Sequence, residues 1–188
     1  MSRRITASLA SLCALLGLGG CGGARDDLPP LPRVAQVDLP RYMGDWYVIA
    51  SIPSFLEKDT YDAVESYAVR PDGRIQTTFR YRQGGHDEPV KTMHPIGTVK
   101  PGTGNALWDM QFFWPIQAEY VISHVSEDYS QTIVARSARD LVWIMARTPS
   151  IPPADYQAHL ARIRAMGYDT TRLRLVPHTP AGAVLGKD

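Results

Sequence analysis

Alternating apolar and polar residues form a series of short segments along the chain from about residue 43 onward. The segments are rich in Val, Ile, Thr and aromatic residues, which suit the half-buried surface of a sheet, and turn-forming residues separate them. The pattern predicts eight strands, which cover residues 43–52, 62–69, 74–83, 90–100, 105–114, 118–125, 130–137 and 140–147. An all-β domain is therefore expected.

The links between these strands are short and carry turn signals. Arg70-Pro71-Asp72-Gly73 is typical of a tight hairpin, and Gly84-Gly85 and Pro101-Gly102-Thr103-Gly104 indicate further ones. Short hairpins place consecutive strands side by side and antiparallel, whereas a sandwich needs longer crossovers. We therefore predict an eight-stranded up-and-down antiparallel barrel, whose interior holds side chains or one small ligand.

A helical pattern follows the last strand. Tyr156, Leu160 and Ile163 recur at the spacing of one helix face, in a segment that begins near Pro153 and is expected to end at Gly167. The apolar stripe predicts one C-terminal α-helix packed outside the barrel. Basic residues on the same segment leave open a helix that lies on a membrane surface. A short final strand is expected at residues 173–176.

The first 21 residues have the layout of an export signal. A basic start is followed by an apolar run over residues 9–18, which is too short to span a bilayer as a helix, and then by Gly19, Gly20 and Cys21. The last four residues of this segment resemble the bacterial lipobox. That resemblance implies removal of residues 1–20 and lipidation of Cys21. An ordinary secretory signal with a chance cysteine remains the alternative.

The rest of the chain divides by composition. Residues 21–40 are rich in Gly, Pro and charge and are predicted to form a tether, residues 41–177 the barrel domain, and residues 178–188 a flexible tail. Removing residues 1–20 leaves 18 basic and 19 acidic residues, a formal net charge of −1, which gives no indication of nucleic-acid binding. Cys13 and Cys21 are the two cysteines, so the mature domain has neither a disulfide nor a thiol nucleophile.

Three short motifs carry a family resemblance. Gly44-x-Trp46 opens the first strand, Asp128-Tyr129 lies in a later hairpin, and Arg147 follows the last strand. Their order and spacing resemble the lipocalin family, in particular the bacterial outer-membrane lipocalins and the apolipoprotein D group, over about residues 38–177. The resemblance implies that Arg147 packs across Trp46 and that these residues, with Gly44, close one end of the barrel. Their roles are expected to be structural.

Strand periodicity assigns other side chains to the barrel interior. If Trp46 points inward, Val48 and Ala50 do so as well. If Arg147 points inward, so do Met145 and Trp143 on the same strand. The residues predicted to line a ligand pocket are Val48, Ala50, Phe79, Tyr81, Phe112, Trp114, Tyr120, Trp143 and Met145. Simple core packing is the competing explanation for each of them. A mostly apolar pocket of this kind suits an acyl chain.

The resemblance implies a binding protein for fatty acids or lysophospholipids, with no cofactor and no metal. It places the domain in the periplasm, held at the outer membrane by the lipid on Cys21, and it allows a homodimer. A phosphate or carboxylate headgroup has four basic candidates at the mouth, although solvated surface charge is the preferred explanation of each. They are Lys58, Arg80, Arg82 and Lys91.

Two other classes of function remain open at this point. No nucleophile elbow, phosphate loop, dinucleotide fingerprint or paired-histidine motif is present in the sequence, so we do not expect an enzyme. Some lipocalins are nevertheless isomerases or de-epoxidases. A haem or pigment binder would need a histidine that points into the barrel, and His94 and His124 are the candidates that lie in strands.

Overall fold

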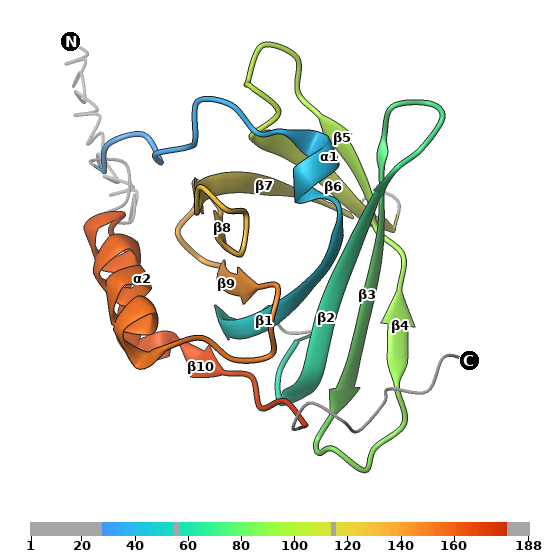
Figure 1. Ribbon diagram of the computed structural model, residues 1–188, viewed down its shortest axis with the longest axis vertical. Helices are drawn as coiled ribbons and strands as arrows, with labels where there is room; N and C mark the ends of the chain where they lie inside the picture. The colour runs from blue at the N-terminus through green and yellow to red at the C-terminus, as the bar shows by residue number, and fades with distance from the viewer. Residues whose placement is uncertain (1–27, 55–56, 114–115, 180–188) are drawn as a thin grey trace, which may run out of the picture.

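A computed structural model describes residues 28–54, 57–113 and 116–179 as a closed antiparallel barrel with one long helix outside it (Figure 1). The barrel strands are β1 (Gly44–Ile52), β2 (Thr60–Val69), β3 (Ile75–Gln83), β4 (Lys91–Met93), β5 (Ile96–Val99), β6 (Leu107–Phe113), β7 (Ile116–Val125), β8 (Gln131–Ala135) and β9 (Val142–Ala146). Sequential neighbours pair antiparallel around the barrel, and β1 pairs with β9 to close it. The predicted eight-stranded up-and-down barrel is confirmed, with β4 and β5 together occupying the position of one strand.

The strand predicted over residues 90–100 is divided in two. Pro95 has no backbone N–H to donate and interrupts the ladder between β4 and β5, while its carbonyl oxygen accepts a hydrogen bond from the Thr77 N–H at 3.0 Å. Both pieces still pair with β3, in the registers Phe79↔Met93 and Ile75↔Gly97. The break therefore bends this part of the wall without opening it.

A bulge in β1 overturns the prediction for Ala50. The β1–β9 register passes from Val48↔Met145 to Ala50↔Ile144, so one extra residue is inserted in β1. The insertion reverses the parity of every following side chain. Val48 stays in the barrel core, whereas Ala50 packs on the outer face beneath the helix, and Ser51 takes the position opposite Trp143.

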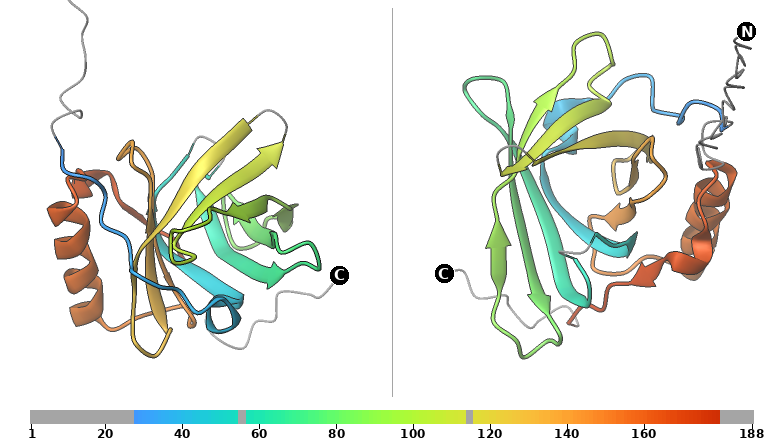
Figure 2. Two further views of the ribbon diagram at one scale, coloured as in Figure 1. Left: turned by 90° about the horizontal axis from the view of Figure 1, so that it is seen from above. Right: turned by 180° about the vertical axis from the view of Figure 1, so that it is seen from behind.

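The long helix, α2 (Pro153–Ala165), lies along the outside of the barrel wall (Figure 2). Ile163 is completely buried in a second apolar cluster between the helix and the wall, and Tyr156 packs against the same cluster. Gly167 follows the helix with a φ of 86°, the left-handed conformation expected of a C-terminal glycine. The packing interpretation of the stripe is confirmed, since the face that a membrane-lying helix would present to lipid is covered by the barrel.

The described segments that flank the barrel are more firmly held than predicted. The tether boundary at residue 40 is too late, because the Val34 and Val37 N–H groups bond to barrel carbonyls at 3.0 and 2.8 Å and Val37 is fully buried. A short helix that the sequence did not predict, α1 (Leu39–Tyr42), begins at the Asp38 N-cap. Residues 1–27, with Cys21 and the signal segment, lie outside the described residues.

The C-terminal part also contacts the barrel. A short 3-10 helix, η1 (Thr170–Arg172), leads into β10 (Arg174–Leu175), which pairs with β1 at Ala50 and Ser51. The predicted tail began at residue 178, yet the Thr179 N–H donates to the Asp62 carboxylate at 2.6 Å. The part of the predicted tail at residues 180–188 lies outside the described residues.

Candidate functional site

One end of the barrel is closed by α1 and by a fully buried indole. Trp46 has no exposed surface, and its Nε1–H donates to the carbonyl oxygen of Tyr42 at 2.8 Å. The Tyr42 ring comes from α1, is also fully buried, and lies 5.0 Å from the Trp46 ring between centroids. Gly44 turns the chain into β1 with a φ of 90°, which a residue with a side chain adopts only at a cost.

Arg147 lies over the outer side of this closure. Its guanidinium carbon is 3.7 Å from the centroid of the Trp46 ring, a close cation–π contact. Its Nη1 donates to the Asp45 carbonyl oxygen at 2.7 Å and its Nη2 to the Arg41 carbonyl oxygen at 2.8 Å. One side chain therefore fastens α1 and the start of β1 to the end of β9, as the resemblance implied.

Replacing Arg147 with lysine is expected to lower the free energy of unfolding by about 2 kcal/mol. Lysine keeps the charge, but its ammonium group cannot lie flat on the indole while it donates to the carbonyl oxygens of both Asp45 and Arg41. Urea denaturation followed by circular dichroism measures the loss. The matched control is Arg70→Lys, because Arg70 forms an exposed ion pair with Asp72 at 3.5 Å, and such pairs contribute less than about 1 kcal/mol. Equal losses in the two variants would contradict a fastening role for Arg147.

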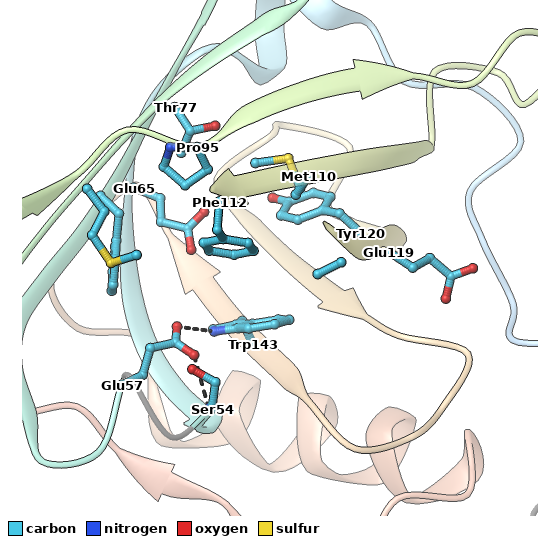
Figure 3. Close-up of a pocket in the computed structure, with 13 residues that line it drawn as sticks. Ser54, Glu57, Glu65, Thr77, Pro95, Met110, Phe112, Glu119, Tyr120 and Trp143 are labelled. Carbon is cyan, nitrogen blue, oxygen red and sulfur yellow. Dashed lines mark hydrogen bonds between the residues drawn. The ribbon is translucent and has the colours of Figure 1, made fainter. Parts of the chain in front are cut away.

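A cavity of about 40 Å³ lies inside the barrel, between the aromatic closure and the opposite end (Figure 3). Four of the predicted pocket residues line it: Phe79, Phe112, Tyr120 and Trp143. The other apolar lining side chains belong to Met93, Pro95, Met110 and Ala118. Phe112 projects between Tyr120 and Trp143 in the close-up. The site is therefore a narrow, mostly apolar space.

Other predicted pocket residues face the interior without reaching the cavity. Val48 and Met145 are buried in the barrel core, and Tyr81 stacks on Phe79 with a centroid distance of 4.8 Å. Core packing is the explanation that fits these three. Trp114 lies outside the described residues.

Five polar residues outside the predicted set also line the cavity: Ser54, Glu57, Glu65, Thr77 and Glu119. Glu65 pairs in register with Trp46 on one side and Phe79 on the other, which are both inward side chains. Strand alternation could have identified Glu65, because Ala63, Glu65 and Tyr67 are alternate residues of β2 and therefore lie on the same face. The carboxylate was overlooked because charged residues in barrels usually face solvent.

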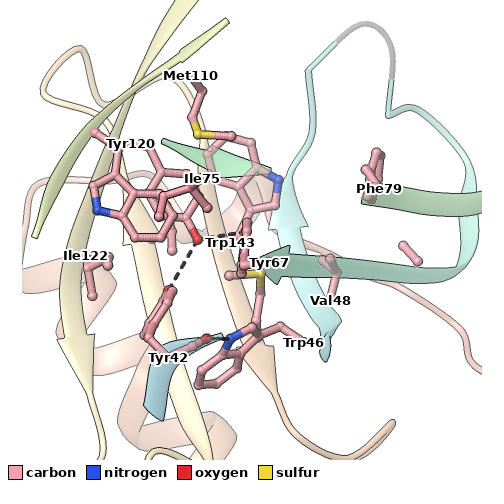
Figure 4. Close-up of a cluster of buried hydrophobic side chains, with 14 of the residues drawn as sticks. Tyr42, Trp46, Val48, Tyr67, Ile75, Phe79, Met110, Tyr120, Ile122 and Trp143 are labelled. Atoms are coloured by element: carbon pink, nitrogen blue, oxygen red, sulfur yellow. Dashed lines mark hydrogen bonds between the residues drawn. The ribbon is translucent and has the colours of Figure 1, made fainter. Parts of the chain in front are cut away.

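A buried network of hydroxyl groups extends from Glu65 toward the closed end. Figure 4 shows its three tyrosines, Tyr42, Tyr67 and Tyr120. The Tyr67 hydroxyl donates to the Glu65 carboxylate and lies 2.7 Å from the Tyr120 hydroxyl. The Tyr120 hydroxyl in turn lies 3.2 Å from that of Tyr42, which is 3.3 Å from Thr132 Oγ1. Burial raises the pKa of all three tyrosines, so they stay protonated. The interior thus combines apolar walls with a chain of hydrogen-bonding groups.

The pKa of the Glu65 carboxyl group is raised inside the cavity. Removal from bulk water raises its pKa to about 7, the Tyr67 hydroxyl opposes part of that rise, and the nearby charge of Glu57 adds to it. Glu57 itself accepts hydrogen bonds from Trp143 Nε1 at 2.9 Å and from the Ser54 N–H at 3.1 Å. A carboxyl group therefore changes protonation inside the cavity near neutral pH.

The two histidines considered for haem do not face the interior. His94 is exposed near Thr78 on the outer side of β3, and His124 lies in an outer groove beside α2, where its ring centroid is 5.6 Å from that of His159. The requirement of the haem or pigment hypothesis is therefore not met by either. Among the residues that the structure describes, no group of three or more His, Cys, Asp or Glu side chains is placed to hold a metal ion.

The four basic headgroup candidates are not gathered into one site. Arg80 pairs with Asp45 at 3.7 Å and Arg82 with Asp62 at 3.5 Å, while Lys91 donates to Gln83 at 2.6 Å. Lys58 is exposed at the β1–β2 link. Within the described part of the chain, no helix has the length and apolar character needed to cross a bilayer.

Comparison with known proteins agrees with this geometry. Residues 37–178 match a family model described as a lipocalin-like domain. The outer membrane lipoprotein Blc of Vibrio cholerae is 27% identical over 143 residues, which cover 74% of this chain and 82% of that protein. Temperature-induced lipocalin-1 of Arabidopsis thaliana is 25% identical over 154 residues, covering 78% of this chain and 82% of that one.

The same fold is found in a solved structure with little sequence identity. Insecticyanin from the tobacco hornworm Manduca sexta superposes with a TM-score of 0.63 at 13% identity, covering 82% of this chain and 87% of that chain. A sequence identity of 13% supports a shared fold and nothing further.

Proposed function

The chain belongs to the lipocalin-like family, and on that basis we propose that it binds fatty acids or lysophospholipids and stores or transports them for maintenance of the cell envelope. Lipocalins bind small hydrophobic ligands, and the fold is generally one of binding or transport. The observation that carries the proposal is the cavity inside the barrel, with an aromatic wall formed by Phe79, Phe112 and Trp143. Apolar walls with few polar groups are typical of sites for lipid chains.

Ligand entry must enlarge this cavity. Its volume of about 40 Å³ has room for only a few water molecules, which need roughly 10–15 Å³ each, and a long acyl chain is far larger. Met93 and Met110 in the lining have flexible, unbranched side chains, and Phe112 is half-buried. We expect these side chains to move aside while the closed end around Trp46 stays fixed.

The proposed location is the periplasmic face of the outer membrane. The supporting observations are the lipobox-like segment that ends at Cys21 and the relatives named as outer membrane lipoproteins. Several acyl chains on one residue would hold the domain stably at a membrane. The barrel would then lie within reach of the bilayer that supplies its ligand.

Titration of the purified protein with a lysophospholipid or a fatty acid is expected to quench or shift its tryptophan fluorescence, because Trp143 lines the cavity. Trp143→Phe should remove most of the fluorescence change while calorimetry still detects binding. Mass spectrometry of the protein as isolated is expected to find bound lipid. Failure of both lipids to change the fluorescence or the heat signal, with no lipid co-purifying, would refute the proposal.

The anchor has its own test. Cys21→Ala is expected to move the protein from the outer-membrane fraction to the soluble periplasmic fraction, as detected by immunoblotting after fractionation. The variant barrel should bind lipid normally, since residue 21 lies outside the matched domain at residues 37–178. If the variant stayed in the membrane fraction, lipidation of Cys21 could not be the means of attachment.

A further inference from the structure

One buried hydroxyl in the lipid cavity lacks a hydrogen-bond partner. Thr77 is 1% exposed and lines the cavity, and its Oγ1 has no partner among the described residues. Leaving a buried hydroxyl without a partner costs about 1–3 kcal/mol, so such groups are usually satisfied or serve a purpose. A threonine inside an apolar barrel is therefore a candidate contact for a polar group on the ligand.

Glu65 lies diagonally across from Thr77 on the same inner face of the sheet. The β2–β3 register pairs Thr77 with Tyr67 and Phe79 with Glu65, so Thr77 and Glu65 are diagonal neighbours. Diagonal neighbours on one sheet face are about 7–8 Å apart at the backbone, a span that one hydroxyl or amino group can bridge between two side chains. In Figure 3 both residues lie at the same end of the cavity, and the Glu65 carboxylate points toward Phe112.

The charge of the cavity selects the kind of group that can be held there. Glu57, Glu65 and Glu119 line it, whereas no Arg, Lys or His is among the described residues that do so. A ligand carboxylate brought to Glu65 would meet a like charge with no cation to compensate, at a place removed from bulk water. A hydrogen-bond donor would instead find two acceptors, the Glu65 carboxylate and Thr77 Oγ1.

We propose that Glu65 and Thr77 form a polar subsite that selects lipids bearing a hydroxyl or protonated amino group at the end that enters the barrel, and that excludes free carboxylates from this position. The inference rests on the proposed lipid-binding function and refines it. Of the two lipid classes named above, it disfavours fatty acids that enter with the carboxylate first.

The raised pKa of Glu65 agrees with this selection. Near neutral pH the carboxyl group is partly ionised, and an ammonium group would stabilise the ionised form. The protonated form can both donate a hydrogen bond to a ligand hydroxyl and accept one from it. The Tyr67 hydroxyl holds the carboxyl group in place. The subsite is thus built on the buried network rather than on a mobile surface chain.

The test compares four ligands with one chain length on the full-length protein held in a nanodisc: decanol, decylamine, decanoate and decyl methyl ether. Binding is followed by tryptophan fluorescence at about pH 8, where Glu65 is mostly ionised. Decanol and decylamine are expected to bind about tenfold more tightly than the ether, which cannot donate a hydrogen bond, and decanoate more weakly than the ether.

Two variants and one control assign the preference to the subsite. Thr77→Val should lower decanol affinity about fivefold and leave the ether unchanged, and Glu65→Gln should lower decylamine affinity about tenfold. Thr78→Val, at the adjacent outward position, should change neither. Thr77→Val removes an unpartnered buried hydroxyl and is expected to fold.

The possible results separate this inference from the function on which it rests. Equal binding of the four ligands, tighter binding of decanoate, or variants that leave the ranking intact would overturn the subsite while lipid binding itself stands. If none of the four ligands bound, the subsite would be overturned, and the titrations with lysophospholipid and fatty acid described above would decide whether lipid binding itself stands.

Discussion

Trp46→Ala is expected to lower the free energy of unfolding by about 4 kcal/mol, because large-to-small changes at a buried tryptophan typically cost about 3–5 kcal/mol. The indole has no exposed surface and lies between the Tyr42 ring inside the barrel and the Arg147 guanidinium. Alanine would leave a void at the closed end and remove the bond from Nε1 to the Tyr42 carbonyl oxygen. Equilibrium urea denaturation monitored by circular dichroism measures the change.

Trp46→Phe is the matched control for this prediction. Phenylalanine keeps an aromatic ring against Tyr42 and Arg147 but cannot donate the indole hydrogen bond, so we expect a smaller loss of about 1–2 kcal/mol. If the alanine variant lost no more stability than the phenylalanine variant, the closed end would not depend on the volume of this side chain. The ranking of the two variants is therefore as informative as either value.

Glu65→Gln is expected to raise the free energy of unfolding by about 3 kcal/mol at about pH 8. The folded state raises the pKa of this carboxyl from 4.5 to about 7, and each pH unit of such a shift corresponds to about 1.4 kcal/mol. Glutamine has nearly the same shape and still accepts the Tyr67 hydroxyl. It removes the cost of holding a negative charge inside the barrel.

The sign of the pH dependence follows from where the proton is held. Below pH 4.5 the carboxyl is protonated in both the folded and unfolded states, so the wild-type protein and the variant should be equally stable. Between 4.5 and about 7 the unfolded chain releases the proton and the folded protein retains it, so wild-type stability falls relative to the variant as the pH rises. Above about 7 the full difference is present.

Urea denaturation of both proteins at about pH 4 and about pH 8 measures this difference. The control is Glu88→Gln, because Glu88 is exposed in the β3–β4 link and its replacement should change stability by less than about 0.5 kcal/mol at either pH. Subtracting the variant curve from the wild-type curve removes contributions shared by both, such as that of Asp62, whose pKa is lowered by His86 and Thr179 against the opposing effect of burial. A difference that does not change with pH would show that Glu65 is not the group responsible.

Most of the barrel could be predicted because its cause is local. Alternation of apolar and polar residues marks each strand, and turn residues such as Asp72-Gly73 set the hairpins that make neighbours antiparallel. The helix α2 could also be predicted, from one apolar stripe and from Gly167 just after its end. The short α1 was not, because four residues give too little periodicity, and its place depends on Tyr42 packing inside the barrel.

The candidate site was predicted in part. Phe79, Phe112, Tyr120 and Trp143 line the cavity as expected, while the bulge after Val48 turned Ala50 to the outer face. A bulge is an irregularity of pairing between β1 and β9, which are about 100 residues apart in sequence. Alternation alone gives no sign of the bulge, so Ala50, which was assigned to the inner face, lies on the outer one.

The sequence by itself determined the strand order, the outer helix and the three residues Gly44, Trp46 and Arg147 that meet at the closed end. The tertiary structure alone decided that the cavity is narrow, that Glu65 and Thr77 share its inner end, and that no described basic side chain faces them. The physical reason is that alternation assigns a side chain to one of two faces, whereas free volume, missing partners and pKa depend on residues that only the closed barrel brings together.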